Sequence, residues 1–237
     1  MNKINTSVFA IIQARMGSSR FPRKMLARLG PYTLIEWVFI RVNKTKNIDK
    51  VLLATSDLPR DDELVKIANK YNINVYRGSE LDVLKRFYNA AYENKAKTII
   101  RICADNPFID PIELDRLINF YKENECDYAF NHQNKLKGNY ADGFGAEIFS
   151  YNLLQKVNKI AKDPNHREHV TLYLWEIKTK YIVMPVPAPK FLNYPHLRFD
   201  IDLPKDKDKI ESIINNGVTI NSSAQEIVDI FLSGNYN

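Results

Sequence analysis

The sequence SVFAIIQARMGSSRFPRK, residues 7–24, joins a short apolar run to a loop of small and basic residues. The run from Val8 to Ala14 is interrupted only by Gln13, and its short length and sharp end predict a buried parallel strand. In the loop that follows, tight turns would aim backbone N–H groups at an anion while cations surround the same point. The residues that would do so are Gly17, Ser18, Ser19, Arg15, Arg20, Arg23 and Lys24. This layout predicts a phosphate site at the carboxyl edge of a sheet, and the alternative is a solvated basic turn.

The spacing within this loop disfavours two common phosphate-binding folds. It matches neither G-x-x-x-x-G-K-[ST] nor G-x-G-x-x-G, so neither a P-loop ATPase nor a dinucleotide-binding fold is indicated. Four cations are also more than a single phosphate group needs. We therefore expect a polyphosphate held in a different arrangement.

The composition predicts one domain that binds a small polyanion. The chain has 237 residues, 45% of them hydrophobic, and no linker-like segment divides it, so residues 1–237 are expected to form a single domain. The net charge is +6. The cations are spread along predicted helices rather than massed in a stripe with interleaved aromatic residues, so we expect no nucleic-acid partner.

Cysteine usage and apolar runs indicate a cytoplasmic protein. Cys103 and Cys126 lack the spacing of a disulfide framework or a zinc site, which favours a reducing compartment. The N-terminal apolar stretch is too short for a signal peptide, and no run approaches the ~20 residues that span a bilayer. We therefore expect no membrane span.

Strands and helices are predicted to alternate along the chain. Strands are expected at 8–14, 50–55, 73–76, 98–104 and 127–131, and helices at 33–44, 61–71, 81–95 and 111–123. After a polar loop at 133–139, strands are expected at 143–149, 182–189 and 197–201, and helices at 152–161, 167–179 and from 204 onward. Residues beyond 215 are expected to be only partly ordered. This order predicts an α/β fold with a Rossmann-like, doubly wound, mostly parallel sheet.

Two aspartates follow predicted strands at the edge where ligands of open α/β sheets bind. Asp105 follows the strand at 98–104, and Asp202 shares one face of the strand at 197–201 with Asp200 by the period of two. With the cationic loop they predict a magnesium–nucleotide site, since Mg²⁺ prefers one or two carboxylates plus substrate phosphates. The alternatives are a turn-forming role for Asp105 and a helix cap for Asp202, the role that we expect for Asp110 before the helix at 111–123.

A histidine pair leaves several interpretations open. His166 and His169 are spaced i, i+3, which could suggest zinc, but no third ligand lies at a suitable spacing. The other interpretations are a helix start that contacts substrate through Arg167, or an ordinary helix surface.

Motifs in a fixed order now point to one family. The loop IIQARMGSSRFPRK matches Q-A-R-x-G-S-S-R-x-P-x-K at every specified position. The blocks ATSDLPRDDEL, YRGSELDVLKRF, RICADNPFID, YADGFGAEIFS, REHVT and LRFDIDLPKD follow in the family's order. Over nearly its whole length the chain resembles the cytidylyltransferases that activate acidic sugars, including acylneuraminate and ulosonate cytidylyltransferases, and most closely the spore-coat-polysaccharide type. It departs where the family commonly reads V-D-T-P-E-D, although Asp202 and Asp206 remain.

The resemblance implies a nucleotide-diphospho-sugar transferase type of fold and a Mg²⁺-dependent transfer of CMP from CTP. The acceptor would be an acidic sugar, or a sugar or polyol phosphate, with release of pyrophosphate, for synthesis of surface polysaccharide or glycoconjugate. A homodimer is also implied. Residues 133–195 would form a subregion for the acceptor and for dimerisation.

The resemblance also assigns roles residue by residue. The triphosphate would be held by Ala14, Arg15, Gly17, Ser18, Ser19, Arg20 and Lys24. Base and ribose would lie near Arg77, Gly78, Ser79 and Asp82. Asp105 and Asp202 would bind Mg²⁺ and act in catalysis with Arg15, Arg20 and Lys24. The second substrate would face Asp142, Gly143, Glu147, Arg167, Glu168 and His169.

Two other classes of protein remain as alternatives. A glycosyltransferase that uses nucleotide sugars would share the sheet and the magnesium, but its D-x-D motif usually follows a central strand, whereas Asp200-Ile201-Asp202 lies late in the chain. A catalytically idle nucleotide sensor or RNA-binding domain would bind without turnover.

Overall fold

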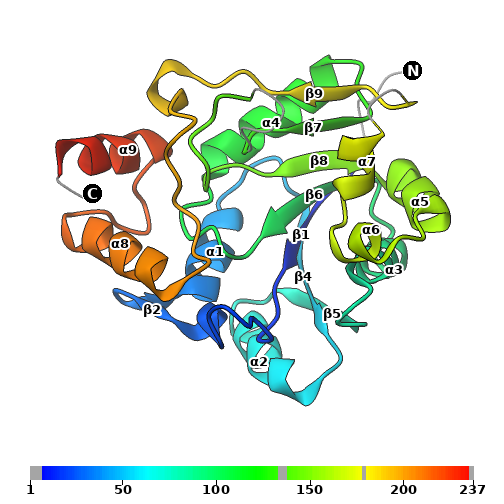
Figure 1. Ribbon diagram of the computed structural model, residues 1–237, viewed down its shortest axis with the longest axis horizontal. Helices are drawn as coiled ribbons and strands as arrows, with labels where there is room; N and C mark the ends of the chain where they lie inside the picture. Colours follow the sequence, from blue (N-terminus) through cyan, green and yellow to red (C-terminus); the bar gives the residue numbers. More distant parts are fainter. Residues whose placement is uncertain (1–6, 133–137, 178–179, 235–237) are drawn as a thin grey trace.

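A seven-stranded sheet forms the centre of the computed structural model, which describes residues 7–132, 138–177 and 180–234 (Figure 1). The strand order is β5-β4-β1-β6-β8-β7-β9. The strands are β1 (Val8–Gln13), β4 (Lys50–Ser56), β5 (Asn74–Gly78), β6 (Thr98–Cys103), β7 (Tyr128–Phe130), β8 (Glu147–Ser150) and β9 (Val183–Pro185). A separate ribbon joins β2 (Arg28–Leu29) to β3 (Tyr32–Thr33).

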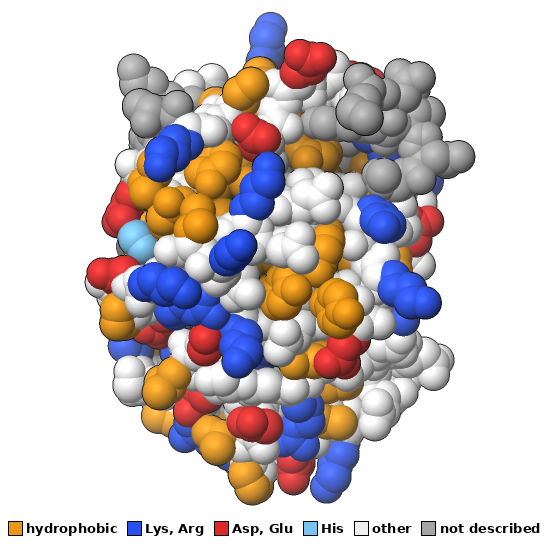
Figure 2. All heavy atoms as spheres, turned by 90° about the vertical axis from the view of Figure 1, so that its right-hand side faces the viewer, with side chains coloured by type: hydrophobic (Ala, Val, Ile, Leu, Met, Phe, Trp, Pro, Cys, Tyr) orange, Lys and Arg blue, Asp and Glu red, His pale blue; other side chains and the backbone are white. Residues whose placement is uncertain are grey.

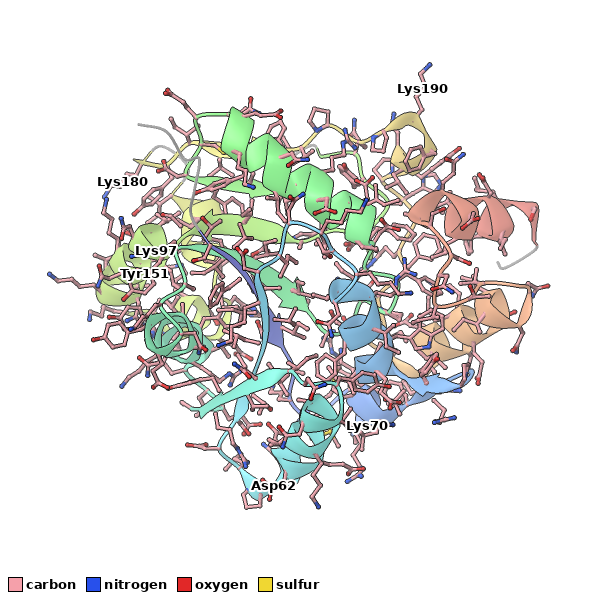
Figure 3. The ribbon with its side chains drawn as sticks, turned by 180° about the vertical axis from the view of Figure 1, so that it is seen from behind. Asp62, Lys70, Lys97, Tyr151, Lys180 and Lys190 are labelled. Carbon is pink, nitrogen blue, oxygen red and sulfur yellow. The ribbon has the colours of Figure 1, made fainter. Side chains whose placement is uncertain are left out.

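Helices cover both faces of this sheet. They are α1 (Leu34–Val42), α2 (Asp62–Lys70), α3 (Val83–Glu93), α4 (Pro111–Glu123), α5 (Tyr151–Ile160), α6 (Pro164–Glu168), α7 (Leu172–Glu176), α8 (Pro204–Asn215) and α9 (Ala224–Ser233). Figure 3 shows the molecule from behind, with Asp62 and Lys70 at the two ends of α2. The expected α/β fold with a doubly wound, mostly parallel sheet is confirmed.

Alternation along β1 divides the core into two layers. Val8, Ala10 and Ile12 pack into the cluster that holds α1, α2, α4, α8 and α9. Phe9 and Ile11 point the other way, into the cluster that holds α3, α5 and α7. Because successive strand residues face opposite sides, a continuous apolar run is what a strand covered on both faces requires. On the outer surface of the second layer, Figure 2 shows Lys and Arg side chains scattered between hydrophobic patches.

The register of the sheet places the predicted phosphate loop beside the end of β6. β1 pairs in parallel with β4 and with β6, and Gln13 lies opposite both Ala54 and Cys103. The carboxyl ends of these strands therefore form one edge, and the residues that follow β1 and β6 meet there.

Three predicted elements differ in the structure. The strand expected at 143–149 is β8, which runs antiparallel to β6 and β7, because the described part of the preceding connection contains no crossover helix. The segment 197–201 makes one bridge, between Arg198 and Asp142, rather than a strand. Over residues 167–177, the described part of the helix expected at 167–179, the structure has the end of α6 and then α7, because Pro164 starts α6 early and the backbone at His169 is extended.

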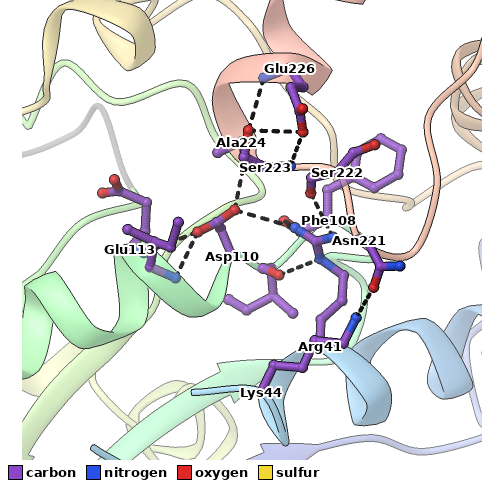
Figure 4. Close-up of polar contacts among 12 residues, drawn as sticks. Arg41, Lys44, Phe108, Asp110, Glu113, Asn221, Ser222, Ser223, Ala224 and Glu226 are labelled. Atoms are coloured by element: carbon purple, nitrogen blue, oxygen red, sulfur yellow. Dashed lines mark hydrogen bonds and ion pairs between the residues drawn. The ribbon is translucent and has the colours of Figure 1, made fainter. Parts of the chain in front are cut away.

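The expectation of partial order beyond residue 215 is wrong for residues 224–233, which form α9, whereas residues 235–237 lie outside the described residues. A buried cation ties α9 to the rest of the fold (Figure 4). Arg41 is 2% exposed and donates to the carbonyls of Ile109, Ile220 and Ser222. Its guanidinium also pairs at 3.3 Å with Asp110, whose carboxylate accepts a bond from the Ala224 N–H at the start of α9. These contacts join α9 to α1 and α4.

Asp110 has the capping role that the sequence predicts. Its Oδ1 accepts hydrogen bonds from the backbone N–H groups of Ile112 and Glu113 at the start of α4. In the described ranges, no helix has the length and apolarity to cross a membrane.

Candidate active site

Two adjoining cavities open at the carboxyl ends of β1 and β6. The first, of about 310 Å³, lies over the phosphate loop. The second, of about 450 Å³, lies over β6 and the segments around residues 142 and 200. Both are lined by Arg20, Arg101, Cys103, Asp105, His169 and Asp202. The two cavities thus form one cleft that can hold two ligands side by side.

The phosphate loop brings most of its predicted residues to the first cavity. The lining includes Ala14, Arg15, Gly17, Ser18, Ser19, Arg20 and Lys24. The Ser18 hydroxyl accepts a bond from the Phe21 N–H and so fixes the turn. Arg23 differs from its neighbours, because its guanidinium pairs at 2.7 Å with Glu63 and lines neither cavity.

Asp105 and Asp202 converge on Lys24 from two separate segments. The Lys24 ammonium lies 3.4 Å from Asp105 Oδ2 and 3.2 Å from Asp202 Oδ1, and it donates to the Ile201 carbonyl at 2.9 Å. Arg20 also pairs with Asp202, at 3.2 Å. The expected meeting of cations and carboxylates at the sheet edge is therefore present.

The capping alternative for Asp202 is wrong. The carboxylate of Asp206, not that of Asp202, accepts the backbone N–H groups of Asp202 and Leu203 at the start of α8. Asp202 is left facing the cleft with Asp105. These are two hard oxygen donors, which suit a magnesium ion that also binds substrate phosphates. Within the described ranges, no group of three or more His, Cys, Asp or Glu residues is arranged to hold a metal.

The residues expected near the base and ribose lie at the end of β5 and in the connection from β5 to α3. The Arg77 guanidinium donates to the carbonyls of Ser56 and Leu58, and Asp82 accepts the Lys85 N–H as the cap of α3. The Ser79 hydroxyl accepts the Asp82 N–H. None of these side chains is among the residues that line the cavities, whereas the neighbouring Val83 is. The side chains of Arg77, Ser79 and Asp82 instead stabilise the backbone between β5 and α3.

A buried ion pair supports the floor of the cleft. Glu147 is 1% exposed, and its Oε1 accepts from Arg101 at 2.9 Å and contacts His132 Nε2 at 3.1 Å. Burial alone would raise the pKa of Glu147, but the Arg101 charge and the His132 hydrogen bond lower it to about 2. Glu147, expected to face substrate, instead lies behind Arg101 and holds it toward both cavities.

Asp142 faces the second cavity, as expected for a substrate contact. Burial raises its pKa to about 6, His132 opposes that shift and Asp200 adds to it. Gly143, expected beside it at the substrate, does not line the cavity. Its φ is +113°, and a Cβ there would lie 2.9 Å from the Cβ of Phe199, so this glycine lets two segments meet closely.

The segment around α6 is divided between the cleft and the scaffold. Glu168 and His169 line the first cavity, and Glu168 pairs with Arg15 at 3.2 Å. Arg167 lines neither cavity. Its guanidinium binds both carboxylate oxygens of Asp82 and the carbonyl of Asn158, so it ties α6 to α3 and α5 instead of contacting substrate. His166, the other member of the histidine pair, contacts Glu176 at 2.6 Å.

Several residues that line the cleft were not predicted from the sequence. They are Gln13, Arg101, Cys103, Asn106, His132, Gly145 and Arg198. Arg101 and Cys103 carried a signal, because they alternate with Ile100 and Ile102 and share the face that leads to Asp105. Burial raises the pKa of the Cys103 thiol to about 12, so the thiol remains protonated. His132 and Arg198 carried no local signal, since only the tertiary structure brings them to this cleft.

Sequence comparison with known proteins places this chain in a family of nucleotide-using enzymes. A family model described as cytidylyltransferase matches residues 9–233. The chain is 34% identical over 229 residues to the spore coat polysaccharide biosynthesis protein SpsF of Bacillus subtilis, covering 94% of this chain and 93% of that protein.

Solved structures of related proteins share the fold. A cytidylyltransferase from Leptospira borgpetersenii serovar Hardjo-bovis superposes with a TM-score of 0.88 at 28% identity, covering 97% of this chain and 94% of that one. CMP:2-keto-3-deoxy-manno-octonic acid synthetase complexed with CTP has a TM-score of 0.66 at 16% identity, covering 90% and 100%. The motif order, the cleft and the match over residues 9–233 together establish that this chain belongs to the cytidylyltransferase family.

Proposed function

We propose that this protein transfers CMP from CTP to an acidic sugar, or to a sugar or polyol phosphate, and releases pyrophosphate. The observation that carries the proposal is the convergence of Lys24 and Arg20 with Asp105 and Asp202 at one end of the cleft. Cations there suit a triphosphate, and the adjoining second cavity leaves room for an acceptor. Relatives that work in polysaccharide biosynthesis favour a product used for surface polysaccharide or glycoconjugate.

The chemistry needs no protein nucleophile. An acceptor oxygen attacks the α-phosphorus of CTP in line, the bond to the β-phosphate oxygen breaks, and pyrophosphate leaves with the electron pair. Arg15, Arg20 and Lys24 line the first cavity, where they would stabilise the charge that grows on the phosphate oxygens. A phosphate acceptor needs no base, whereas a sugar hydroxyl must give up a proton, for which the cleft carboxylates are available.

We further propose that Asp105 and Asp202 hold Mg²⁺. Their oxygens are of the kind that Mg²⁺ binds, and they lie close enough to share the Lys24 ammonium. When bound, the ion would neutralise charge on the phosphates. The chain's own part is to hold both carboxylates at the sheet edge and to exclude other orientations of the triphosphate.

The same proposal covers the acceptor site, the domain organisation, the oligomeric state and the location of the protein. We assign the acceptor to the subregion 133–195, because Asp142 and His169 face the second cavity. We also propose one domain over residues 1–237, from the composition, a cytoplasmic location, from the cysteine usage, and a homodimer, from the family resemblance.

The test is pyrophosphate release from each of the four nucleoside triphosphates with Mg²⁺ and a panel of acidic sugars and sugar phosphates. We expect release with CTP and one class of acceptor. Asp105→Asn should lower kcat by about 10²-fold to 10³-fold, as expected for loss of one group that stabilises the transition state. Asp208→Asn is the matched control, because Asp208 lies exposed on α8. Absence of CTP binding would overturn the proposal, and turnover of a nucleotide sugar would indicate a glycosyltransferase.

A further inference from the structure

The Lys24 ammonium lies among oxygens in the way that a bound cation would. Its Nζ is 2.9 Å from the Ile201 carbonyl oxygen and within 3.4 Å of both Asp105 and Asp202. The side chain is only 11% exposed. The positive charge of Lys24 therefore neutralises part of the negative charge of Asp105 and Asp202, the two carboxylates that the proposed function assigns to the metal.

The other two phosphate-loop cations that line the first cavity, Arg15 and Arg20, are also paired with carboxylates. Arg20 pairs with Asp202 at 3.2 Å, and Arg15 pairs with Glu168 at 3.2 Å. A triphosphate and a divalent metal need the opposite partners, because the phosphates require the cations and the metal requires the carboxylates. Each ion pair across the cleft must therefore open before both ligands can bind.

We propose that Lys24 stands in for the divalent metal in the free protein and exchanges partners when metal and nucleotide bind together. This inference rests on the proposed function and deepens it. Metal alone would have to displace the ammonium and leave two cations side by side. Nucleotide alone would have to draw Lys24 and Arg20 away from Asp202 and leave that carboxylate facing the phosphates.

The exchange makes metal and nucleotide bind cooperatively. Each ligand removes the charge conflict that the other would create, because the metal neutralises the carboxylates and the triphosphate neutralises the released cations. Coupling between two bound ligands is reciprocal, so each should raise the affinity of the other by the same factor. Lys24 is in this sense a positioning residue as well as a phosphate contact.

The first test measures metal binding without nucleotide. Mn²⁺ prefers the same oxygen ligands as Mg²⁺, and its electron paramagnetic resonance signal reports the free ion. Lys24→Met should bind Mn²⁺ on the order of tenfold more tightly than the wild type, a typical size for a coupling between sites. Arg23→Met is the matched control, because Arg23 is the adjacent cation but pairs with Glu63 outside the cleft. The control should leave Mn²⁺ affinity unchanged.

The second test measures nucleotide binding without metal and remains decisive even where Lys24→Met fails to fold. In EDTA, calorimetry should find that Asp202→Asn binds CTP on the order of tenfold more tightly than the wild type, although this variant loses Mn²⁺ affinity. Asp200→Asn is the control, since Asp200 pairs with Arg198 instead of the phosphate-loop cations. Equal Mn²⁺ affinity in wild type and Lys24→Met, or equal CTP affinity in wild type and Asp202→Asn, would overturn the exchange. The proposed function would still stand where CTP is bound and turned over.

Discussion

Arg15 and Glu168 are 153 residues apart in the chain, yet Nη2 of Arg15 lies 3.2 Å from Oε1 of Glu168 beside the first cavity. The pair joins the phosphate loop to α6. Because both side chains are partly exposed, the pair should contribute no more than about 1 kcal/mol to stability. Its effect should be on ligand binding.

We therefore expect opposite effects on CTP affinity from the two partners. Glu168→Gln should strengthen CTP binding by about threefold, because Arg15 is released and a negative charge is removed, at the level of an exposed ion pair. Arg15→Met should weaken binding by at least tenfold through loss of a charge-assisted phosphate contact. Calorimetric titration of both variants with Mg²⁺ and CTP measures this. Weaker binding by Glu168→Gln would show that Glu168 contacts the nucleotide favourably.

Asp142 should make the stability of the protein depend on pH in an unusual direction for an aspartate. Its folded pKa of about 6 is above the ordinary aspartate value of 3.8, so the folded state holds the proton more tightly than the unfolded state. Stability should fall as pH rises from about 4 to about 6, and the ionised carboxylate should remain unfavourable above that range. Asp142→Asn should thus be more stable than the wild type at pH 8, with no difference below pH 4. Urea denaturation at several pH values provides the comparison.

Glu147 should have the opposite pH dependence. Its folded pKa of about 2 lies below the ordinary glutamate value of 4.5, so the ionised form is favoured by folding. This stabilisation is fully present above about pH 4.5 and is lost as pH falls toward 2. Glu147→Gln should therefore lower stability at pH 7 and flatten the acid limb of the denaturation profile. An acid limb that is unchanged in the variant would contradict the role of the Arg101 pair.

The buried Arg41–Asp110 pair should be required for docking of α9. Removing one partner of a buried ion pair typically costs about 3–5 kcal/mol, so we expect that loss of unfolding free energy for Arg41→Met. Lys44→Met is the control, because Lys44 contacts the carbonyl of Ile220 in the same connection from an exposed position. It should cost less than about 1 kcal/mol. Hydrogen exchange should also reveal faster exchange in α9 of Arg41→Met, and unchanged protection there would refute the docking role.

Alanine substitutions at two glycines with similar φ angles should distinguish the cost of a steric clash from the cost of backbone strain. Gly143 has φ +113° with Phe199 at 2.9 Å from an added Cβ, whereas Gly217 has φ +109° with nothing within 4 Å. Gly217→Ala should cost about 1–2 kcal/mol for the backbone alone. Gly143→Ala should cost more, by about 1–3 kcal/mol for overpacking, and should raise the KM for the acceptor because Asp142 is displaced. Thermal denaturation of both variants measures the two losses of stability, and acceptor kinetics measure KM. Equal losses of stability in Gly143→Ala and Gly217→Ala would contradict a role for the contact with Phe199.

Local features of the chain predicted the phosphate loop and most elements of the sheet. The apolar runs of β1, β4 and β6 are contiguous in sequence, and so are the small and basic residues after β1. The segment after residue 133 was predicted less well. Its antiparallel β8 and the broken helix at α6 and α7 depend on packing against distant strands rather than on local periodicity.

The sequence by itself determined the α/β class, the cation-rich loop and the position of Asp105 after β6, because strand periodicity, small residues and charges act over a few neighbouring positions. Only the tertiary structure decided which charges meet. It brings Lys24 to Asp202 and Ile201, turns Arg167 to Asp82 and places Glu147 beneath Arg101. Those pairings follow from strand order and from the contacts of segments far apart in the chain, and electrostatic energies depend on such distances and on burial.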